Sequence, residues 1–336
     1  MNRYCMGIDL GGTSIKLALI DAAADPPRFG EVLRVTTPAG DPEGIVAAMV
    51  SGARHLLARD GVAAADVAGI GVGAPGPMRR DAGVIVNAPN LPELSGLPLR
   101  DRLTGALALP AVLENDANAA AWGEFRFGAG RAADVHSMVL MTLGTGVGGG
   151  IVADGQLVHG AHDFAGEVGH MIIHPGGLPC SCGQRGCLEQ YASAVNIARR
   201  AAEAVQAGRP SALADVLARD GALAADDVNA ARARGDRLAA EIWDQATHSL
   251  AVACINLQRL LDCQMIVLAG GLTRAGDDLL TPVRRHYAAL NWRMTDTLVD
   301  IVLACLGDDA GVFGAAGIAW QTFAAPAAPR SLLGTL

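Results

Sequence analysis

Three of the seven cysteines lie close together in the sequence, at Cys180, Cys182 and Cys187. This spacing is too tight for a set of disulfides, whereas thiolates separated by glycine turns are typical ligands of a structural Zn²⁺. A tetrahedral site needs a fourth ligand, and the two nearby histidines, His170 and His174, are both candidates. The odd number of cysteines and this cluster indicate a reducing compartment and a metal-binding knuckle.

Glycine-rich turns follow apolar runs at three places. In residues 9–16, DLGGTSIK, glycines let backbone amides approach a ligand, and Asp9 and Lys16 carry charges that suit Mg²⁺ and phosphate. The spacing is not that of a Walker A loop or a dinucleotide fingerprint, and a plain β-hairpin is the alternative. Residues 143–150, LGTGVGGG, hold more glycines than a structural hairpin needs. Residues 268–272, LAGGL, end a third run, where a simple strand-to-helix turn is the alternative.

Together these turns predict a site that clamps a polyphosphate through backbone amides. The residues expected at this site are Asp9, Gly11, Gly12, Thr13, Lys16, Gly144, Thr145, Gly146, Gly270 and Gly271.

Asn115 and Asp116 stand where an apolar strand ends and a helix begins. Side chains at such a position project from a rigid edge, and the helix N-terminus supports a negative charge, which suits a general base. Asn and Asp are also preferred N-caps of helices, so a purely structural role is the alternative.

Apolar runs and helical spacing predict an α/β protein with two similar halves, each containing a strand, a glycine turn and a second strand. Strands are expected at residues 4–10, 15–20, 67–72, 111–113, 137–143, 151–153, 265–268 and 301–304. Helices are expected at residues 42–59, after 116, at 192–207, 212–223, 236–261 and 277–289, and from 311. The length suits two lobes, which we expect at residues 1–116 and 117–311, with a C-terminal helix at about 312–325 packing on the first.

The charge and hydropathy of the chain exclude several classes of partner. The formal net charge is −8 and the isoelectric point is about 5.4, whereas nucleic acids and anionic membranes require a basic face. No apolar run reaches the roughly 18–20 residues that cross a bilayer, and the first residues lack the regions of a signal peptide. We therefore expect a cytoplasmic protein that acts on a small molecule and binds neither nucleic acid nor membrane.

The ordered motifs resemble those of the ROK family of bacterial sugar kinases and sugar-responsive repressors. These motifs are DLGGTSIK, GAPGP, ENDANAAAWGE, LGTGVGGG, GEVGHM, CSCGQRGCLE and LAGGL, and the resemblance extends over about residues 5–320. It implies an α/β, actin-like (ribonuclease-H-like) two-lobe sugar-kinase fold that binds ATP and Mg²⁺ and phosphorylates a free hexose. It also implies a homodimer.

The resemblance further implies roles for individual residues around the sugar. Asp116 matches the residue that takes a proton from the attacking hydroxyl. The residues that match family contacts to the sugar are Asn90, Asn115, Glu167, His170 and Glu189. The resemblance also favours His170 over His174 as the fourth zinc ligand, so that His170 contacts both metal and sugar. For the two glutamates, a solvated surface charge is the alternative.

Among hexoses, the resemblance favours glucose, phosphorylated to glucose 6-phosphate. Kinases for N-acetylglucosamine, N-acetylmannosamine, mannose and fructose share the same polar contacts and remain alternatives. A transcriptional repressor of the same family is the alternative from another class of function. Such repressors carry a winged-helix domain before the phosphate hairpin, which here starts at Asp9, and the acidic charge also argues against DNA binding.

Overall fold

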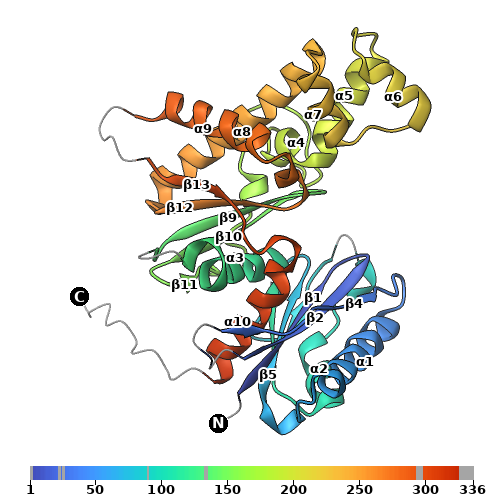
Figure 1. Ribbon diagram of the computed structural model, residues 1–336, viewed down its shortest axis with the longest axis vertical. Coiled ribbons are helices and arrows are strands. Elements are labelled where there is room, and N and C mark those ends of the chain that lie inside the picture. The colour runs from blue at the N-terminus through green and yellow to red at the C-terminus, as the bar shows by residue number, and fades with distance from the viewer. Residues whose placement is uncertain are drawn as a thin grey trace. The chain divides into compact units, whose positions relative to one another are not determined.

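The chain forms two compact units (Figure 1) in a computed structural model that describes residues 3–21, 24, 27–88, 91–131, 135–292 and 298–324. The first unit contains residues 1–127, 161–163 and 309–336. The second contains residues 128–160 and 164–308.

Helix α3 (Asp116–Phe127) belongs to the first unit, so the division suggested by the sequence after residue 116 is displaced to the end of this helix. The reason is the packing of α3 against helix α10 (Ala310–Phe323), which lies in the same unit. A Cβ atom at Gly314 would lie 1.7 Å from the carbonyl oxygen of Ala119, so the two helix backbones are in contact. Residue 325, where the sequence suggests the end of the last helix, lies outside the described residues.

A six-stranded sheet forms the centre of the first unit. Its strands are β1 (Tyr4–Leu10), β2 (Ser14–Asp21), β3 (Arg28–Phe29), β4 (Leu33–Thr36), β5 (Val67–Ala74) and β8 (Ala111–Asn115). The short glycine turn makes β1 and β2 antiparallel, with Asp9 opposite Lys16. Strands β5 and β8 continue the sheet in parallel to β1, while β3 and β4 pair with β2. The carboxyl ends of three parallel strands therefore meet at one edge.

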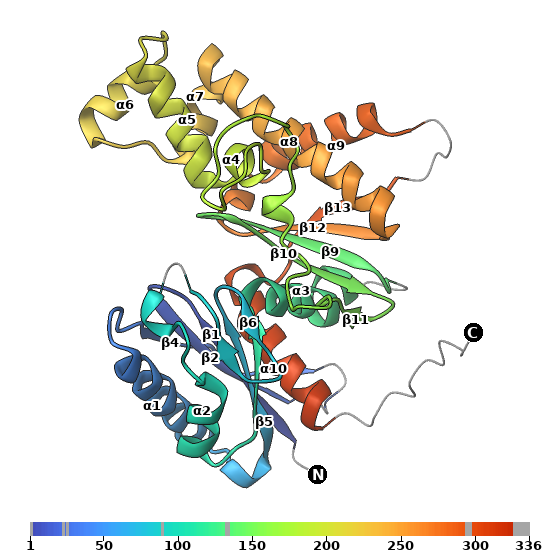
Figure 2. The same cartoon turned by 180° about the vertical axis from the view of Figure 1, so that it is seen from behind.

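Helices cover both faces of this sheet. Helices α1 (Pro42–Asp60) and α2 (Leu99–Leu107) lie side by side (Figures 1 and 2), and their apolar residues share a core with alternate strand residues such as Ile8. Because successive strand residues point to opposite faces, Gly7 faces helix α10 instead. A Cβ at Gly7 would lie 1.9 Å from the carbonyl oxygen of Val312. Glycine at this position therefore allows α10 to lie directly on the sheet.

The second unit repeats the arrangement of hairpin and parallel strands. Its sheet has the order β11 (Gln156–Leu157), β10 (Val147–Ala153), β9 (Met138–Leu143), β12 (Met265–Ala269) and β13 (Asp300–Leu303). Strands β9 and β10 are antiparallel around the second glycine turn, and β12 and β13 run parallel to β9. The strand expectations are thus confirmed in position, with ends that differ by one or two residues for most of them.

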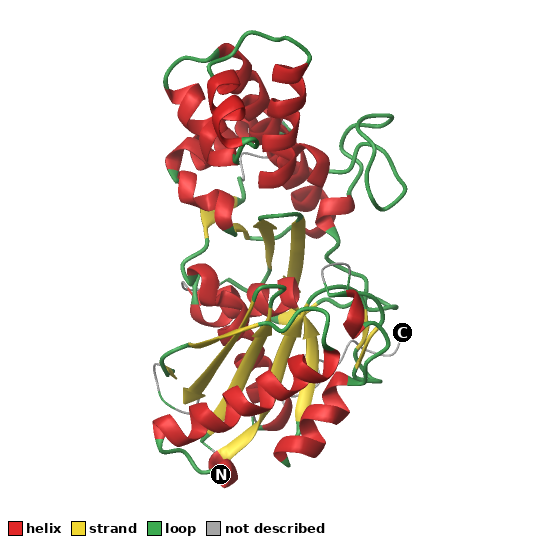
Figure 3. Ribbon diagram, turned by 90° about the vertical axis from the view of Figure 1, so that its right-hand side faces the viewer, coloured by secondary structure: helices red, strands yellow, loops and turns green. Residues whose placement is uncertain are grey.

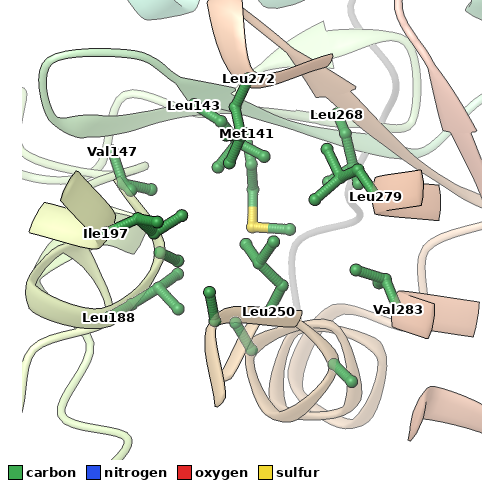
Figure 4. Close-up of a cluster of buried hydrophobic side chains, with 14 of the residues drawn as sticks. Met141, Leu143, Val147, Leu188, Ile197, Leu250, Leu268, Leu272, Leu279 and Val283 are labelled. Atoms are coloured by element: carbon green, nitrogen blue, oxygen red, sulfur yellow. The ribbon is translucent and has the colours of Figure 1, made fainter. Parts of the chain in front are cut away.

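The helices of the second unit pack on this sheet. Figure 3 shows helices in red and strands in yellow. They are α4 (Glu189–Ala192), α5 (Ala194–Gln206), α6 (Leu213–Asp220), α7 (Ala225–Ala233), α8 (Arg237–Leu261) and α9 (Asp277–Leu290). Figure 4 shows the core beneath them, where Met141 of β9 points toward Leu250 of α8 and toward Val283 of α9. The helix expected at residues 192–207 starts after Ser193, whose side chain caps α5, and α7 has no counterpart in the sequence prediction.

Short elements complete the description. They are η1 (Ala64–Asp66), β6 (Met78–Arg79), β7 (Val84–Ile85), η2 (Pro92–Leu94), η3 (Ala129–Arg131), η4 (Val168–His170), η5 (Gly271–Ala275) and η6 (Gly307–Asp309). Within the described ranges, every helix is too short or too polar to span a membrane.

Candidate active site

The first glycine turn connects β1 to β2 and places Asp9 beside Lys16. The Lys16 Nζ lies 3.4 Å from the Asp9 Oδ2, and both side chains are largely buried. Burial raises the pKa of the Asp9 carboxyl, and the Lys16 ammonium opposes this shift only in part. A Cβ at Gly311 would lie 3.0 Å from the same carboxylate, so Asp9 lies against the first residues of α10. The sequence prediction identified this carboxylate, but not its position against a helix some 300 residues away.

Hydrogen bonds from Thr37 fix the backbone of this turn. The Thr37 hydroxyl donates to the Gly11 carbonyl oxygen (2.7 Å), and the Thr37 amide donates to the Thr13 carbonyl oxygen (3.1 Å). Gly12 and Thr13 are exposed at the tip. The amides and the Thr13 hydroxyl at this tip are therefore accessible to a ligand.

Asn115 and Asp116 lie at the junction of β8 and α3, where the strand ends at Asn115 and the helix begins at Asp116. The Asn115 Oδ1 accepts hydrogen bonds from the amides of Ala117 (2.9 Å) and Asn118 (3.1 Å). Asn115 is thus the side chain that caps the helix. The Asp116 Oδ1 accepts from the Ala117 amide at 2.8 Å, and its side chain is half-buried.

A buried ion pair supports this junction and was not predicted from the sequence. Glu114 is 1% exposed, and its carboxylate accepts hydrogen bonds from the Asn115 amide (2.9 Å) and from the Asn118 side chain (3.0 Å). The Arg80 Nε lies 3.1 Å from the other oxygen of this carboxylate. Asp163 also pairs with Arg80, at 3.9 Å between the Asp163 Oδ1 and the Arg80 Nη1. Arg80 and Glu114 are far apart in sequence, so spacing alone gave no signal of this pair.

The second glycine turn, between β9 and β10, is fixed at both ends. The Gly144 carbonyl oxygen accepts a hydrogen bond from the Ala194 amide at the start of α5 (2.9 Å). The Val147 amide donates to the Glu189 Oε2 (3.0 Å). Glu189, expected at the sugar, therefore also contacts the backbone of this turn.

The third turn approaches the second one closely. Gly270 has a φ of 88°, and a Cβ at this position would lie 2.7 Å from the carbonyl oxygen of Leu143. Both the backbone angle and the space require glycine here. The ends of β12 and β9 thus meet side by side.

A cavity of about 380 Å³ opens beside these two turns, with Gly144, Thr145 and Gly271 in its lining. Its size lies within the range of small-molecule sites. The remaining lining is mostly apolar and comes from the helices and from the segment between α6 and α7, for example Val195 and Leu223. Two charged residues at the cavity, Asp226 and Arg274, form an ion pair of 3.5 Å. The sequence prediction did not include most of this apolar lining, because residues such as Val195 and Leu223 lie outside the motifs.

The cysteine knuckle brings together the four residues expected to bind metal. The ligand atoms of His170, Cys180, Cys182 and Cys187 all lie within 4.8 Å of one another. The His170 Nδ1 is 3.7 Å from the Cys180 Sγ, and the Cys182 and Cys187 sulfurs are 3.6 Å apart. Burial raises the pKa of the Cys187 thiol, whereas a backbone hydrogen bond from Gln184 lowers the pKa of Cys182.

The other candidate for the fourth ligand, His174, lies elsewhere. Its Nε2 is 3.3 Å from the hydroxyl oxygen of Ser249, and its ring packs against Tyr191 with centroids 4.4 Å apart. Partial burial lowers the pKa of His174, and the nearby His248 adds to this shift. The geometry therefore favours His170 in the knuckle.

Glu167 and Asn90 are the two remaining residues expected to contact the sugar. Glu167 is exposed and directly precedes η4. Its carbonyl oxygen accepts a hydrogen bond from the His170 amide at 3.1 Å, so the two residues lie on one tight turn. Asn90 lies outside the described residues.

The two sheets, each with a glycine-turn hairpin extended by parallel strands, define the actin-like, ribonuclease-H-like fold of sugar kinases. A ROK family glucokinase from Streptomyces griseus, solved in complex with glucose and AMPPNP, is 33% identical, with a TM-score of 0.77 over 95% of this chain and 99% of that one. The ROK family model matches residues 5–322, and the chain belongs to the ROK family.

Two relatives cover nearly the whole chain. A glucokinase of Halalkalibacterium halodurans is 40% identical over 318 residues, which are 93% of this chain and 94% of the relative. An N-acetylmannosamine kinase of Citrobacter koseri is 33% identical over 315 residues, covering 94% and 98% of the two chains.

Proposed function

We propose that glucose is the preferred substrate of this ATP-dependent hexose kinase and that glucose 6-phosphate is its product. The observation that carries the proposal is the 40% identity to a glucokinase over nearly the whole chain. The glucokinase from Streptomyces griseus, with glucose and AMPPNP bound, supports it. N-Acetylmannosamine is the second candidate, because a kinase for this sugar is similar over the same length.

Asp116 is the proposed general base. Its backbone is fixed on the first turn of α3, where Asn115 caps the helix and the buried Glu114 carboxylate holds the preceding amide. Phosphoryl transfer passes through a loose transition state, so positioning of the attacking hydroxyl matters more than proton removal. The proposed contacts to the sugar hydroxyls come from Asn90, Asn115, Glu167, His170 and Glu189.

Each of the three glycine turns carries residues proposed to bind ATP, and the cavity lies beside the two turns of the second unit. The apolar lining of this cavity suits a flat base, and exposed amides of glycine turns suit phosphate oxygens. Asp9 offers the hard carboxylate oxygen that Mg²⁺ prefers, and Lys16 beside it suits a phosphate oxygen. Bound Mg²⁺ supplies neutralisation of the phosphate charge.

The knuckle is the proposed site of a structural zinc. In a tetrahedral site with Zn–S bonds of about 2.3 Å, two sulfurs lie about 3.8 Å apart, and the Cys182–Cys187 separation of 3.6 Å fits this value. Because the His170 Nδ1 faces the cysteines, its Nε2 is the nitrogen proposed to bond the sugar.

The test measures kcat/KM with ATP and Mg²⁺ for glucose, mannose, fructose, N-acetylglucosamine and N-acetylmannosamine. We expect the highest value for glucose; a higher value for an N-acetylhexosamine would overturn the substrate proposal. We also expect Asp116→Asn to reduce kcat at least about 100-fold, within the range of general-base contributions, while glucose binding by calorimetry persists. Comparable kcat in the variant and the wild type would refute the role of Asp116.

A further inference from the structure

Glu189 makes a contact that the sugar-binding role does not require. Its Oε2 accepts a hydrogen bond from the Val147 amide at 3.0 Å, at the end of the second glycine turn. Glu189 is the first residue of α4 and follows the knuckle after one residue. We propose that Glu189 is a positioning residue for ATP, because it fixes the turn of residues 144–147 in the conformation that accepts phosphate.

The space around Gly146 supports this role. A Cβ atom at Gly146 would lie 2.5 Å from the Glu189 Oε2, well inside contact distance. The carboxylate therefore reaches the turn only because this position is glycine. Glycine at position 146 leaves the space in which the Glu189 carboxylate accepts the hydrogen bond from the Val147 amide.

The segment that carries Glu189 is itself rigid. The Asn196 side chain donates to the Glu189 carbonyl oxygen at 3.1 Å, and the Leu188 amide donates to the Met171 carbonyl oxygen at 2.9 Å. The Ala194 amide fixes the other end of the turn through the Gly144 carbonyl oxygen. Two elements that follow the knuckle thus hold both ends of the turn.

The physical reason for such a contact is the glycine content of the turn. The turn between β9 and β10 consists of Gly144, Thr145 and Gly146, and glycine loses more conformational freedom on ordering than any other residue. A turn that is free before ATP binds must be ordered at the expense of binding free energy. A turn already fixed by Glu189 does not carry this cost, so ATP affinity depends on Glu189 without direct contact between Glu189 and ATP.

This inference rests on the proposal that the turn binds ATP, and its test separates ATP binding from catalysis. Calorimetry measures the Kd of AMPPNP with Mg²⁺ and no sugar, on the full chain. We expect Glu189→Ala to raise this Kd about tenfold, the effect of one charge-assisted hydrogen bond. Glu189→Gln keeps an oxygen acceptor for the Val147 amide, and we expect its Kd within about threefold of wild type.

Matched variants make the expected pattern specific. Gly146→Ala displaces the carboxylate and should raise the Kd as Glu189→Ala does, and the double variant should be no weaker than either single one. Glu167→Ala removes a second proposed sugar contact, so we expect it to weaken glucose binding and leave the Kd of AMPPNP unchanged.

Two results would overturn the inference: a Kd for Glu189→Ala equal to that of wild type, or a loss in Glu189→Gln as large as in Glu189→Ala. If Glu189→Ala unfolds, Gly146→Ala replaces it in the comparison, and a Kd for Gly146→Ala equal to that of wild type would then overturn the inference. Glucose phosphorylation by the wild type is measured separately. Its failure would contradict the proposed substrate and leave the AMPPNP comparison intact.

Discussion

Replacing Arg80 by methionine removes the guanidinium that lies 3.1 Å from the Glu114 carboxylate, a side chain that is only 1% exposed. Methionine keeps a long apolar side chain at the position, so the change isolates the charge. The carboxylate retains its hydrogen bonds from Asn115 and Asn118 but loses its cation. We expect both a loss of stability and a loss of activity.

The magnitude follows from burial. Removing one partner of a buried ion pair costs about 3–5 kcal/mol. The side chain of Arg80 is 26% exposed, and Glu114 keeps two hydrogen bonds, so we expect the lower end, about 3 kcal/mol. At roughly 2–4 °C per kcal/mol for a unit of about 150 residues, Tm should fall by about 6–12 °C. Because the Glu114 carboxylate holds the Asn115 amide, Asp116 should shift and kcat should fall at least about tenfold.

The assay combines thermal unfolding with glucose kinase activity at neutral pH, measured below the transition. Arg79→Met is the control, since it removes the same charge from the exposed neighbouring residue. The double variant Arg80→Met with Glu114→Gln should recover most of the stability, because no unpaired buried charge remains. Similar Tm values for Arg80→Met and Arg79→Met would refute the reasoning.

Three further predictions concern metal, packing and pH. The wild type should contain about one zinc per chain by elemental analysis, the content of a single closed site. Cys182→Ser should lose the zinc together with most of the affinity for glucose. Full activity in a metal-free preparation would contradict this prediction. Gly314→Ala should lower the free energy of unfolding in denaturant by at least about 1–3 kcal/mol, because its Cβ would meet the Ala119 carbonyl oxygen. The control is Gly105→Ala on α2, which has open space around it and should leave the free energy of unfolding unchanged or raise it. Burial raises the pKa of Asp9, so the folded state binds this proton more tightly than the unfolded state, and stability falls as pH rises from the ordinary value of 3.8 through the raised one. Without nucleotide, Asp9→Asn should therefore have a higher Tm than wild type at pH 7 and an equal Tm below that window; an equal Tm at both pH values would be inconsistent with this sign.

Local features of the site could be predicted from the sequence because their geometry is set over a few residues. The cysteine spacing predicted the knuckle, and four of its expected ligand atoms lie within 4.8 Å of one another. The alternation of apolar residues around DLGGTSIK predicted the hairpin in which Asp9 lies opposite Lys16. The strand-to-helix junction at Asn115 and Asp116 was also predicted, although the sequence could not tell which of the two side chains caps the helix.

Contacts between distant segments could not be predicted in this way. The pairing of Arg80 with Glu114 and the position of α3 in the first unit both depend on tertiary packing. The same holds for the contact between Glu189 and the Val147 amide, because no spacing rule connects residues 42 positions apart. Periodicity identifies the elements, but the partner that each element meets is decided by the folded chain.

The position of α10 has a consequence for how the protein is made. Residues 310–323 cover one face of the first sheet, yet a ribosome adds them only after residues 128–308. The face of the sheet around Gly7 and Gly71, which α10 covers in the folded chain, therefore stays uncovered until this helix has been synthesised. We therefore expect the amino-terminal unit to complete its native fold only after translation of these last residues.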